Sequence, residues 1–547
     1  MKSISLVSLL FAVAAFFAVY VTLDDFGLTI DEPINLSHGR NFAMAVLDEK
    51  WDAESVARTW SKGPEHPPLT RFLNGLGQRF VAGSNLASVN LRGGRVSSAV
   101  AFAGIAFLIV RLAASFAGLT AGIAAGLSFV TMPRLFAHAH FASPEIVSAF
   151  FLLWAWIAGG KALLDPKPSA LARFTAVFGA GLILGLALLT KLTSALVPAT
   201  LFVVVFWRRG FRGLPAWLAW FALGMLTFFA GWPWMWPVDV PGMSAGFAGS
   251  FERFRDYLST VFKRADLYVW YFGRQYRGNL VPWHFAPLFF TITTPIITLS
   301  VGGLGLVSAV KRRNHEPRPF SIVVAFVLSL AVFCLPIQRY DGERLFLFLF
   351  PLWSVLAGVG VAWIIQHVGE PMRRWATVAA LVLLALPAME IRRMHPFSLS
   401  YYSIFVGGLN GAEKLGLEPT YWGDSLTPRL LEKLAAAADN DDRVVLAPTL
   451  YGGHPAFLTT PGLAAKSVVV LPGDLALPPG ESPPPNAEPG RPIRWGLVFH
   501  RTGYLIDPLP AALLEQGEVV AEESMDGVWL ARVLKLPPGW RMLSPTR

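Results

Sequence analysis

The stretch GLTIDEP, residues 27–33, comes just after an apolar run over residues 5–23 that is long enough to cross a membrane. It places two carboxylates, Asp31 and Glu32, where the chain leaves the hydrocarbon. A carboxylate at this depth is costly unless it is paired, hydrated or used in chemistry. The pair therefore favours a reactive site at a membrane surface; the alternative is an ordinary solvated helix end capped by acids.

The composition indicates a polytopic membrane protein. Of the 547 residues, 54% are hydrophobic and only 15% are charged, whereas a soluble chain carries about 25% charged residues. The apolar runs predict an all-α membrane protein with about 11 transmembrane helices. The predicted spans cover residues 5–23, 96–112, 115–132, 145–160, 174–190, 193–207, 215–232, 287–310, 319–337, 345–365 and 375–389.

The distribution of Lys and Arg predicts the orientation of these spans. Because cytoplasmic loops are enriched in Lys and Arg, the pattern predicts a cell inner membrane protein with a cytoplasmic N-terminus and an outer C-terminus. It also accounts for the net charge of +10 without a nucleic-acid partner. Five basic connections fall on the side of the N-terminus if the spans alternate, beginning near Arg111, Lys161, Arg208, Lys311 and Arg373.

The chain divides into a membrane domain, residues 1–390, and a small extracytoplasmic α/β domain, residues 391–547. Two long outer loops interrupt the membrane domain, at residues 24–94 and 233–286. In the second domain, short apolar runs rich in β-branched residues predict buried strands after one helix. The helix is expected at residues 426–438 and the strands at residues 443–447, 466–471 and 495–499.

Several outer residues are candidates for chemistry. Asp31 and Glu32 could remove a proton from an acceptor, since a carboxylate at the boundary can meet both lipid-borne and water-borne substrates. Glu65 and His66 precede two prolines, which fix the backbone there; a simple loop break is the alternative. His138, His140 and Glu145 form only a weak metal-ligand pattern, and the single cysteine offers no Cys-based metal site.

Basic residues on the outer side are informative, because Lys and Arg are ordinarily enriched in the cytoplasmic loops instead. Arginine can bind a lipid phosphate through two parallel hydrogen bonds, so these residues are candidate phosphate ligands. The alternative is that they reach ordinary lipid headgroups. The outer cations are Arg95, Lys191, Arg274, Arg277, Arg339 and Arg344.

The order of these motifs resembles the polyprenyl-phosphate-dependent glycosyltransferases of the GT-C class. The similarity is greatest to the protein mannosyltransferases of glycosyltransferase family 39 and to the lipid A aminoarabinose transferases. It covers about residues 1–425. The motifs that carry it are TIDEP at 29–33, EHPPL at 65–69, GLALLTK at 185–191, YRG at 276–278, PWH at 282–284, YDGER at 340–344 and YWGD at 421–424.

The resemblance implies an inverting transfer of a hexosyl or pentosyl group from a polyprenyl phosphate to a protein, lipid or glycan acceptor. It implies that Asp31, with Glu32 beside it, acts as the base on the outer face of the membrane. It further implies that no cofactor is required; a divalent metal is possible but unsupported. The implied phosphate ligands are Lys191, Arg344 and Arg277, and the implied substrate-positioning residues are Glu65, His66, Tyr340 and Asp341.

Three other functions fit part of the pattern. A lipid or solute transporter would explain the spans and the charges near the membrane, but the sequence has no pseudo-symmetric halves. A polysaccharide polymerase or ligase would share the outer site and the lipid-linked donor. A scaffold would use only the outer domain to bind partners.

Overall fold

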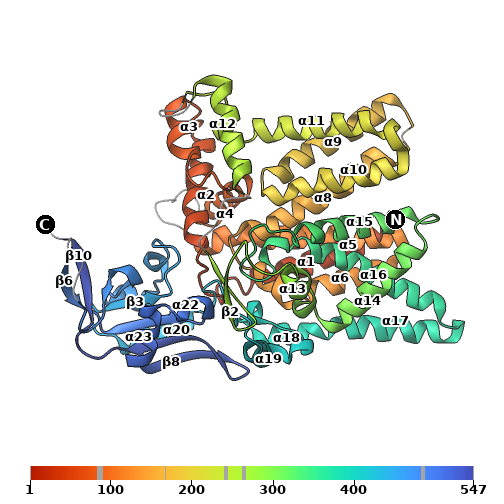
Figure 1. Cartoon of the computed structure of the whole chain (residues 1–547). Helices are drawn as coiled ribbons and strands as arrows, with labels where there is room; N and C mark the ends of the chain where they lie inside the picture. Colours follow the sequence, from red (N-terminus) through yellow and green to blue (C-terminus); the bar gives the residue numbers. More distant parts are fainter. Residues whose placement is uncertain are drawn as a thin grey trace.

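The computed structural model describes residues 2–82, 90–166, 168–239, 244–260, 267–481 and 487–545. Parts of both predicted outer loops, residues 83–89, 240–243 and 261–266, lie outside this description. A bundle of long apolar helices fills one side of the molecule, and a mixed α/β region covers one end of it (Figure 1). The predicted fold class, a helical membrane protein with a small C-terminal sheet region, is confirmed.

Each predicted span overlaps a helix of the bundle, except that residues 287–310 form two helices, α13 and α14, bent by 118° relative to each other. Among the described residues, seven helices are long and apolar enough to cross a membrane, or eight if the bent pair α13–α14 is one span. The count of eleven stays a prediction. Helices α6 and α15 are apolar but shorter than a full membrane span, and residues Leu192–Ala230, which include α10 and α11, count as one span. The bundle helices are α1 (Lys2–Tyr20), α5 (Leu91–Ala117), α6 (Leu119–Val130), α8 (Pro144–Leu164), α9 (Ala170–Leu188), α10 (Leu196–Arg209), α11 (Leu214–Ala230), α13 (Phe285–Thr293), α14 (Ile296–Lys311), α15 (Pro317–Val332), α16 (Leu349–His367) and α17 (Glu370–Ala385).

Helix α16 forms the centre of the bundle, and small residues let α14 approach it. An added Cβ at Gly305 would lie 1.8 Å from the carbonyl oxygen of Leu356, and one at Gly360 would lie 1.9 Å from that of Val301. Close backbone contact through small residues is a common way for membrane helices to associate. These contacts anchor α16, whose preceding turn carries Arg344.

Shorter helices lie across the end of the bundle beside the α/β region (Figure 1). Helix α2 packs against α4, both in the predicted first outer loop. After α12, within the second predicted outer loop, the chain forms an antiparallel hairpin of β1 (Tyr268–Tyr271) and β2 (Arg274–Arg277). The helices of this layer are α2 (Glu32–Leu47), α3 (Ala53–Trp60), α4 (Leu69–Ala82), α7 (Pro133–His138), α12 (Gly246–Ser259), α18 (Pro387–Met394) and α19 (Gly408–Lys414).

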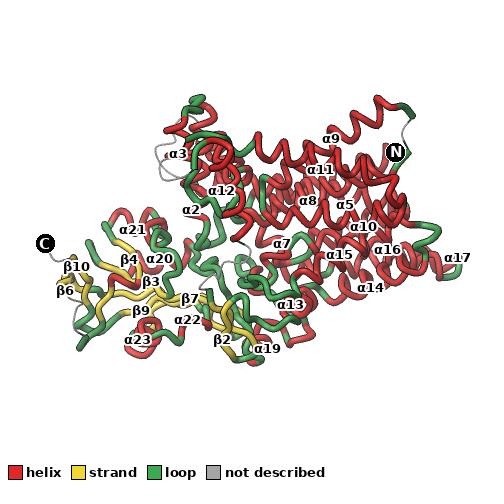
Figure 2. The backbone as a smooth tube through the Cα atoms, turned by 45° about the horizontal axis from the view of Figure 1, so that its top comes forward, coloured by secondary structure: helices red, strands yellow, loops and turns green. Residues whose placement is uncertain are grey.

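The C-terminal region is built on a five-stranded mixed sheet (Figure 2). Its order is β4-β3-β7-β9-β8, with β3 parallel to both neighbours and β9 antiparallel to both of its own. A second sheet has the order β5-β10-β6. The strands are β3 (Arg443–Ala447), β4 (Val469–Pro472), β5 (Ala476–Leu477), β6 (Ala487–Pro492), β7 (Trp495–Phe499), β8 (Glu518–Met525), β9 (Val528–Lys535) and β10 (Arg541–Pro545), and the helices are α20 (Pro428–Ala437), α21 (Pro461–Ala465), α22 (Thr502–Leu505) and α23 (Pro508–Gln516).

The predicted helix at 426–438 and the three predicted strands match α20, β3, β4 and β7. The short apolar runs of β3 and β7 are buried on both faces, as expected for central strands, whereas β4 lies at the edge of the sheet and is partly exposed. The division of the chain near residue 390 stays a prediction, since α18 crosses that point.

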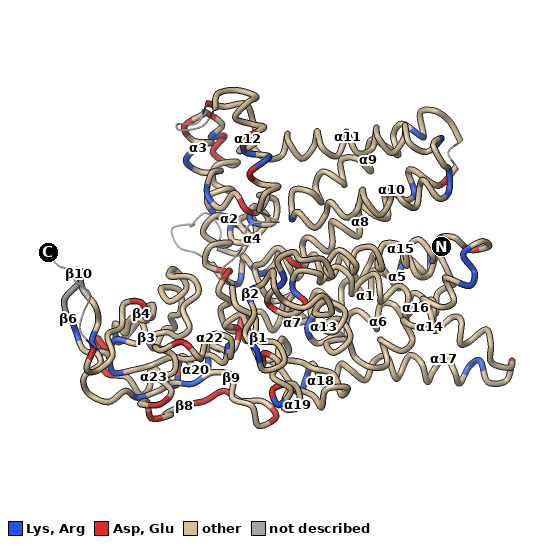
Figure 3. Tube along the Cα trace, in the orientation of Figure 1, with Lys and Arg blue, Asp and Glu red and all other residues tan. Residues whose placement is uncertain are grey.

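Charged residues are concentrated at the two ends of the bundle, and its middle is almost free of them (Figure 3). Lys and Arg mark the end where the chain begins, around the α8–α9 and α10–α11 connections and the start of α17 (Figure 3). The opposite end, next to the α/β region, carries both signs of charge. The protein is therefore a multi-pass membrane protein in which the two ends differ in chemistry.

Candidate functional site

A cavity of about 290 Å³ lies where the bundle meets the α/β region. Segments far apart in the sequence line it: the turn before α2, the loop before α4, the start of α8, the turn before α16 and three loops of the C-terminal region. The residues that line it include Asp31, Asn35, Glu65, His66, Arg71, Tyr340, Asp341, Arg344, Trp422, Tyr451 and Arg501.

The stretch 27–30 is held in place by the backbone of the distant segment 422–424. The N–H of Ile30 donates to the Trp422 carbonyl at 2.9 Å, and that of Gly27 donates to the Asp424 carbonyl at 3.1 Å. A Cβ at Gly27 would lie 2.5 Å from the same Asp424 oxygen, so only glycine permits this approach. The contact fixes the direction in which the next residue, Asp31, leaves the backbone.

Asp31 directs its carboxylate into the cavity instead of capping the helix that follows. It occupies the N-cap position of α2, but its side chain makes no capping hydrogen bond. Its Oδ2 pairs with the guanidinium of Arg344 and accepts a 3.3 Å hydrogen bond from the indole N–H of Trp422. One third of the side chain is exposed. A simple helix-capping role is therefore excluded.

Arg344 is the centre of the site. Besides Asp31, its Nε donates to Glu145 at 2.9 Å and its Nη1 donates to Asp341 at 2.8 Å. The guanidinium also lies over the Trp422 ring, 4.3 Å from its centroid. Burial opposes the charge of Arg344, yet the three carboxylates raise its pKa well above the ordinary value. A fixed positive charge therefore faces the cavity.

Lys191 joins this group through Glu145. Its Nζ donates at 3.0 Å to Glu145 Oε1, the oxygen that also accepts from Arg344. The carboxylate of Glu145 has no exposed surface, and Lys191 follows the end of α9 in a nearly buried position. Glu145 thus holds the two predicted phosphate ligands side by side. The sequence pattern indicates Glu145 only as a weak candidate for a metal ligand.

The turn before α16 takes an unusual backbone shape at Asp341. Both Asp341 and Gly342 have positive φ, 55° and 60°; aspartate tolerates this region better than most residues. The turn aims one Asp341 oxygen at Arg344 and the other at Arg501, whose Nη2 lies 2.9 Å away. Arg501 comes from the C-terminal region, so that region completes the site.

Glu65, His66 and Tyr340 also line the cavity. Burial acts to raise the pKa of Glu65, but the guanidinium of Arg71, 2.9 Å away, outweighs it and the pKa is lowered. Burial, aided by the charge of Arg71, lowers the pKa of His66 to about 4. His66 is therefore neutral at pH 7 and can offer a hydrogen bond without a charge.

Glu32 lies apart from the cavity in a fully enclosed ion pair. Its two oxygens accept 2.7 Å hydrogen bonds from Nε and Nη2 of Arg95, and neither side chain is exposed. The same oxygens accept 2.9 Å hydrogen bonds from the N–H groups of Thr29 and Ala142. Arg95 also donates to the backbone carbonyls of Leu23, Phe26 and Gly27. This pair locks the first connection onto α5.

Arg277, the third predicted phosphate ligand, does not join the others. It ends strand β2 with its side chain exposed, and it does not line the cavity. Among the described residues, no ion pair or side-chain hydrogen bond directs the Arg277 guanidinium toward Arg344. Of the predicted site residues, the structure thus gathers seven around one cavity or its wall: Asp31, Glu65, His66, Lys191, Tyr340, Asp341 and Arg344.

Behind the cavity lies a layer of charged residues that the sequence does not predict, although His138 is a candidate metal ligand there. Arg134 pairs with Glu343 at 2.6 Å, and His138 lies 3.6 Å from the other oxygen of Glu343. The Nε of Arg134 donates to the Tyr401 carbonyl at 2.7 Å. A signal existed, since Glu343 sits between Gly342 and Arg344 in the quoted motif. For Arg501 no local signal exists, because its partner Asp341 is 160 residues earlier.

Within the described ranges, no group of three or more His, Cys, Asp or Glu residues could hold a metal ion. The proposed ligands of the weak metal pattern have other partners. Glu145 accepts hydrogen bonds from Lys191 and Arg344. The ring nitrogens of His140 form hydrogen bonds with the Phe136 carbonyl at 2.7 Å and the Thr22 hydroxyl at 2.8 Å.

The sequence matches no family model and no curated protein. Solved structures, in contrast, share its fold. The apo structure of ArnT from Cupriavidus metallidurans aligns at a TM-score of 0.55 and 14% identity, over 96% of this chain and 97% of that chain. The structure of the same protein bound to undecaprenyl phosphate aligns at 0.52 and 14% identity, over the same shares. The expected GT-C architecture is thereby confirmed as the fold of this chain.

Proposed function

We propose that this protein is an inverting glycosyltransferase that moves a sugar from a polyprenyl phosphate to an acceptor on the outer face of the cytoplasmic membrane. One observation carries the proposal. A partly exposed carboxylate, Asp31, and a buried, fixed cation, Arg344, meet in one cavity although 313 residues separate them. A base and an anion-stabilising group side by side are what glycosyl transfer from a phosphate requires.

In this mechanism the donor phosphate competes with Asp31 for Arg344. When the phosphate binds the guanidinium, Asp31 is released and accepts the proton of the acceptor hydroxyl. The acceptor oxygen then bonds to the anomeric carbon while the bond from that carbon to the phosphate oxygen breaks on the opposite face, through an oxocarbenium-like transition state. The electron pair leaves with the phosphate, which becomes a monoester dianion.

The cations next to Asp31 fit the charge that develops on the leaving group. Arg344 and Lys191 are positioned before reaction by Glu145, so they need no reorganisation when the phosphate gains charge. A preorganised donor of this kind contributes about 3–4 kcal/mol to transition-state stabilisation. We assign Asp31 as the base and give Glu32 a structural role, because the Glu32 side chain has no exposed surface and four N–H donors occupy its oxygens.

The fold agrees with a lipid carrier as donor. One of the solved structures that share this fold holds undecaprenyl phosphate. Here the site lies at the end of the bundle, where a phosphate on a membrane-embedded chain would reach Arg344 and Lys191. We propose that the polar loops of the C-terminal region, with Tyr451 and Arg501 in the cavity wall, face the acceptor.

The direct test is to incubate the purified protein with a panel of radiolabelled polyprenyl-phosphate sugars and candidate acceptors. We expect one donor to give a labelled product with inverted anomeric configuration. A polymerase would instead give products of increasing length. Flux of lipid or solute across vesicles without any labelled product would contradict the proposal in favour of transport.

A matched pair of variants tests the phosphate assignment. Lys191→Gln leaves Glu145 paired with Arg344, so we expect an intact fold and a KM for the donor raised more than that for the acceptor. The control is Lys414→Gln, which removes a lysine at the end of α19 that does not line the cavity. An equal effect of Lys191→Gln on both KM values would contradict phosphate binding.

A further inference from the structure

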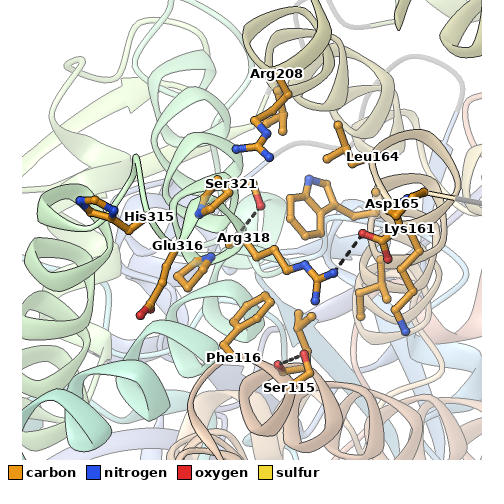
Figure 4. Close-up of a pocket in the computed structure, with 18 residues that line it drawn as sticks. Ser115, Phe116, Lys161, Leu164, Asp165, Arg208, His315, Glu316, Arg318 and Ser321 are labelled. Carbon is orange, nitrogen blue, oxygen red and sulfur yellow. Dashed lines mark hydrogen bonds and ion pairs between the residues drawn. The ribbon is translucent and has the colours of Figure 1, made fainter. Parts of the chain in front are cut away.

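A second cavity, of about 400 Å³, lies at the other end of the bundle, between α5, α8, α10 and α15 (Figure 4). Helix α8 begins at the candidate active site with Pro144 and ends at this cavity with Leu164. Its 21 residues span about 30 Å, the thickness of the hydrocarbon core. The second cavity therefore lies near the opposite membrane surface.

The floor of this cavity is apolar and its rim is basic. Leu112, Trp156 and Val204 are buried side chains of the floor. Arg208 and Arg318 extend from different helices and point into the space between them (Figure 4). An apolar floor under a charged rim matches the boundary between acyl chains and headgroups.

The rim carries more positive than negative charge toward the cavity. Asp165 is the carboxylate that faces Arg318, at 3.2 Å, and the Arg318 side chain is still 63% exposed. The carboxylate of Glu316 points away from the centre (Figure 4) and lies 3.5 Å from Arg312 instead. The indole N–H of Trp156 has no hydrogen-bond partner in the described part of the chain. The cavity is thus richer in donors than in acceptors.

We propose that this cavity binds the phosphodiester headgroup of an anionic glycerophospholipid. The two guanidinium groups hold the phosphate oxygens, and the first carbons of the acyl chains lie on the apolar floor. The contrast with the active site supports a ligand of this kind. There, Arg344 is already shared among three carboxylates, whereas at this rim Arg208 pairs with none in the described ranges.

The test uses the full-length protein in neutral detergent and native mass spectrometry. Phosphatidylglycerol, phosphatidylcholine and glycerol phosphate are titrated separately. At about 1 kcal/mol for each arginine near an anionic lipid, we expect the double variant Arg208→Gln/Arg318→Gln to bind phosphatidylglycerol about thirtyfold more weakly. The matched control is Arg212→Gln/Arg313→Gln, which removes two exposed arginines of the same end that do not line the cavity.

A variant that should strengthen binding distinguishes a specific loss of lipid affinity from a loss caused by misfolding. Asp165→Asn frees Arg318 and should strengthen phosphatidylglycerol binding about fivefold. Three results would overturn the proposal: equal affinity for phosphatidylcholine, unchanged binding in the Arg208/Arg318 variant, or no gain with Asp165→Asn. If glycerol phosphate binds as tightly as the lipid, the ligand is a soluble anion and the lipid assignment is wrong.

Discussion

The cavity around Asp31 and the closed cluster around Glu32 are built from adjacent residues, yet their chemistry is opposite. Asp31 is one-third exposed and shares its guanidinium partner with two other carboxylates, Glu145 and Asp341. Glu32 has no exposed surface, and two guanidinium nitrogens and two backbone N–H groups occupy its oxygens. A carboxylate that is fully occupied by the fold has no lone pair for a substrate. The role of each carboxylate therefore depends on its solvent access and its unoccupied lone pairs rather than on its position in a motif.

The largest expected effect separates chemistry from folding at Asp31. Asp31→Asn keeps the shape of the side chain but removes its basicity, so we expect kcat to fall by about 10²–10⁴-fold with no loss of thermal stability. The check is a turnover assay with the labelled donor beside a thermal melt. The control is Asp48→Asn, an exposed acid at the C-terminus of α2. Wild-type turnover of Asp31→Asn would remove the residue from the mechanism.

The reverse outcome is expected one residue later. Glu32→Gln leaves the buried charge of Arg95 without its counter-ion, which should lower the free energy of unfolding by about 3–5 kcal/mol. Unfolding in detergent, followed by tryptophan fluorescence, measures it. Turnover per folded molecule should stay within a few-fold of the wild type. A stable but inactive Glu32→Gln protein would show that Glu32, too, takes part in the reaction.

A third carboxylate, Glu418, differs from Asp31 and Glu32 because it is buried and bonded to backbone N–H groups instead of a guanidinium. It accepts hydrogen bonds from the backbone N–H groups of Trp270 and Gly503, and burial raises its pKa to about 7. Its folded pKa lies above the ordinary value of 4.5, so its contribution to stability is full below pH 4.5 and is lost as pH rises through 7.

Glu418→Gln removes this pH dependence. Relative to the wild type, the variant's free energy of unfolding should therefore be higher at pH 8 than at pH 5, by up to about 3 kcal/mol. Melting temperatures at the two pH values report this difference. Glu515→Gln, an exposed residue of α23, is the control and should show the wild-type pH dependence. An unchanged pH dependence in Glu418→Gln would mean that Glu418 is already ionised in the folded protein.

A smaller effect is expected where the C-terminal region reaches the cavity. Arg501→Gln removes the ion pair with Asp341, and we expect the KM for the acceptor to rise about tenfold, the cost of one hydrogen bond to a charged group. The kcat should change little, because the substitution removes none of the contacts of Arg344 with Asp31, Glu145 and Asp341. A change confined to the donor KM would place Arg501 on the phosphate side instead.

The smallest effect is expected at Arg277. Its side chain is exposed and lies outside the cavity, so Arg277→Gln should change stability by less than about 0.5 kcal/mol and leave both KM values unchanged. Steady-state kinetics with donor and acceptor varied in turn provide the check. A raised donor KM would show that the β1–β2 hairpin moves toward the phosphate during the reaction.

Much of the site could be predicted, because charged residues are rare and costly near the hydrocarbon region and therefore indicate function. Asp31, Lys191 and Arg344 stood out as charges at span ends, and the structure brings all three to one place. Glu145 stood at a span end as well but was read as a weak metal ligand. Its role as a bridge between Lys191 and Arg344 depends on the packing of three separate helical segments, which no local pattern records.

The sequence alone is enough to predict the apolar spans, the helix α20, the strands β3, β4 and β7, the membrane character of the chain and the positions of its charges along it. Hydrophobic length and periodicity are local properties, and so they can be read locally. The enclosure of Glu32, the position of Arg277 outside the cavity and the presence of Arg501 in its wall are visible only in the folded chain. The reason is that the role of a charge is set by which partners occupy its hydrogen-bonding atoms, and those partners come from 63 to 313 residues away.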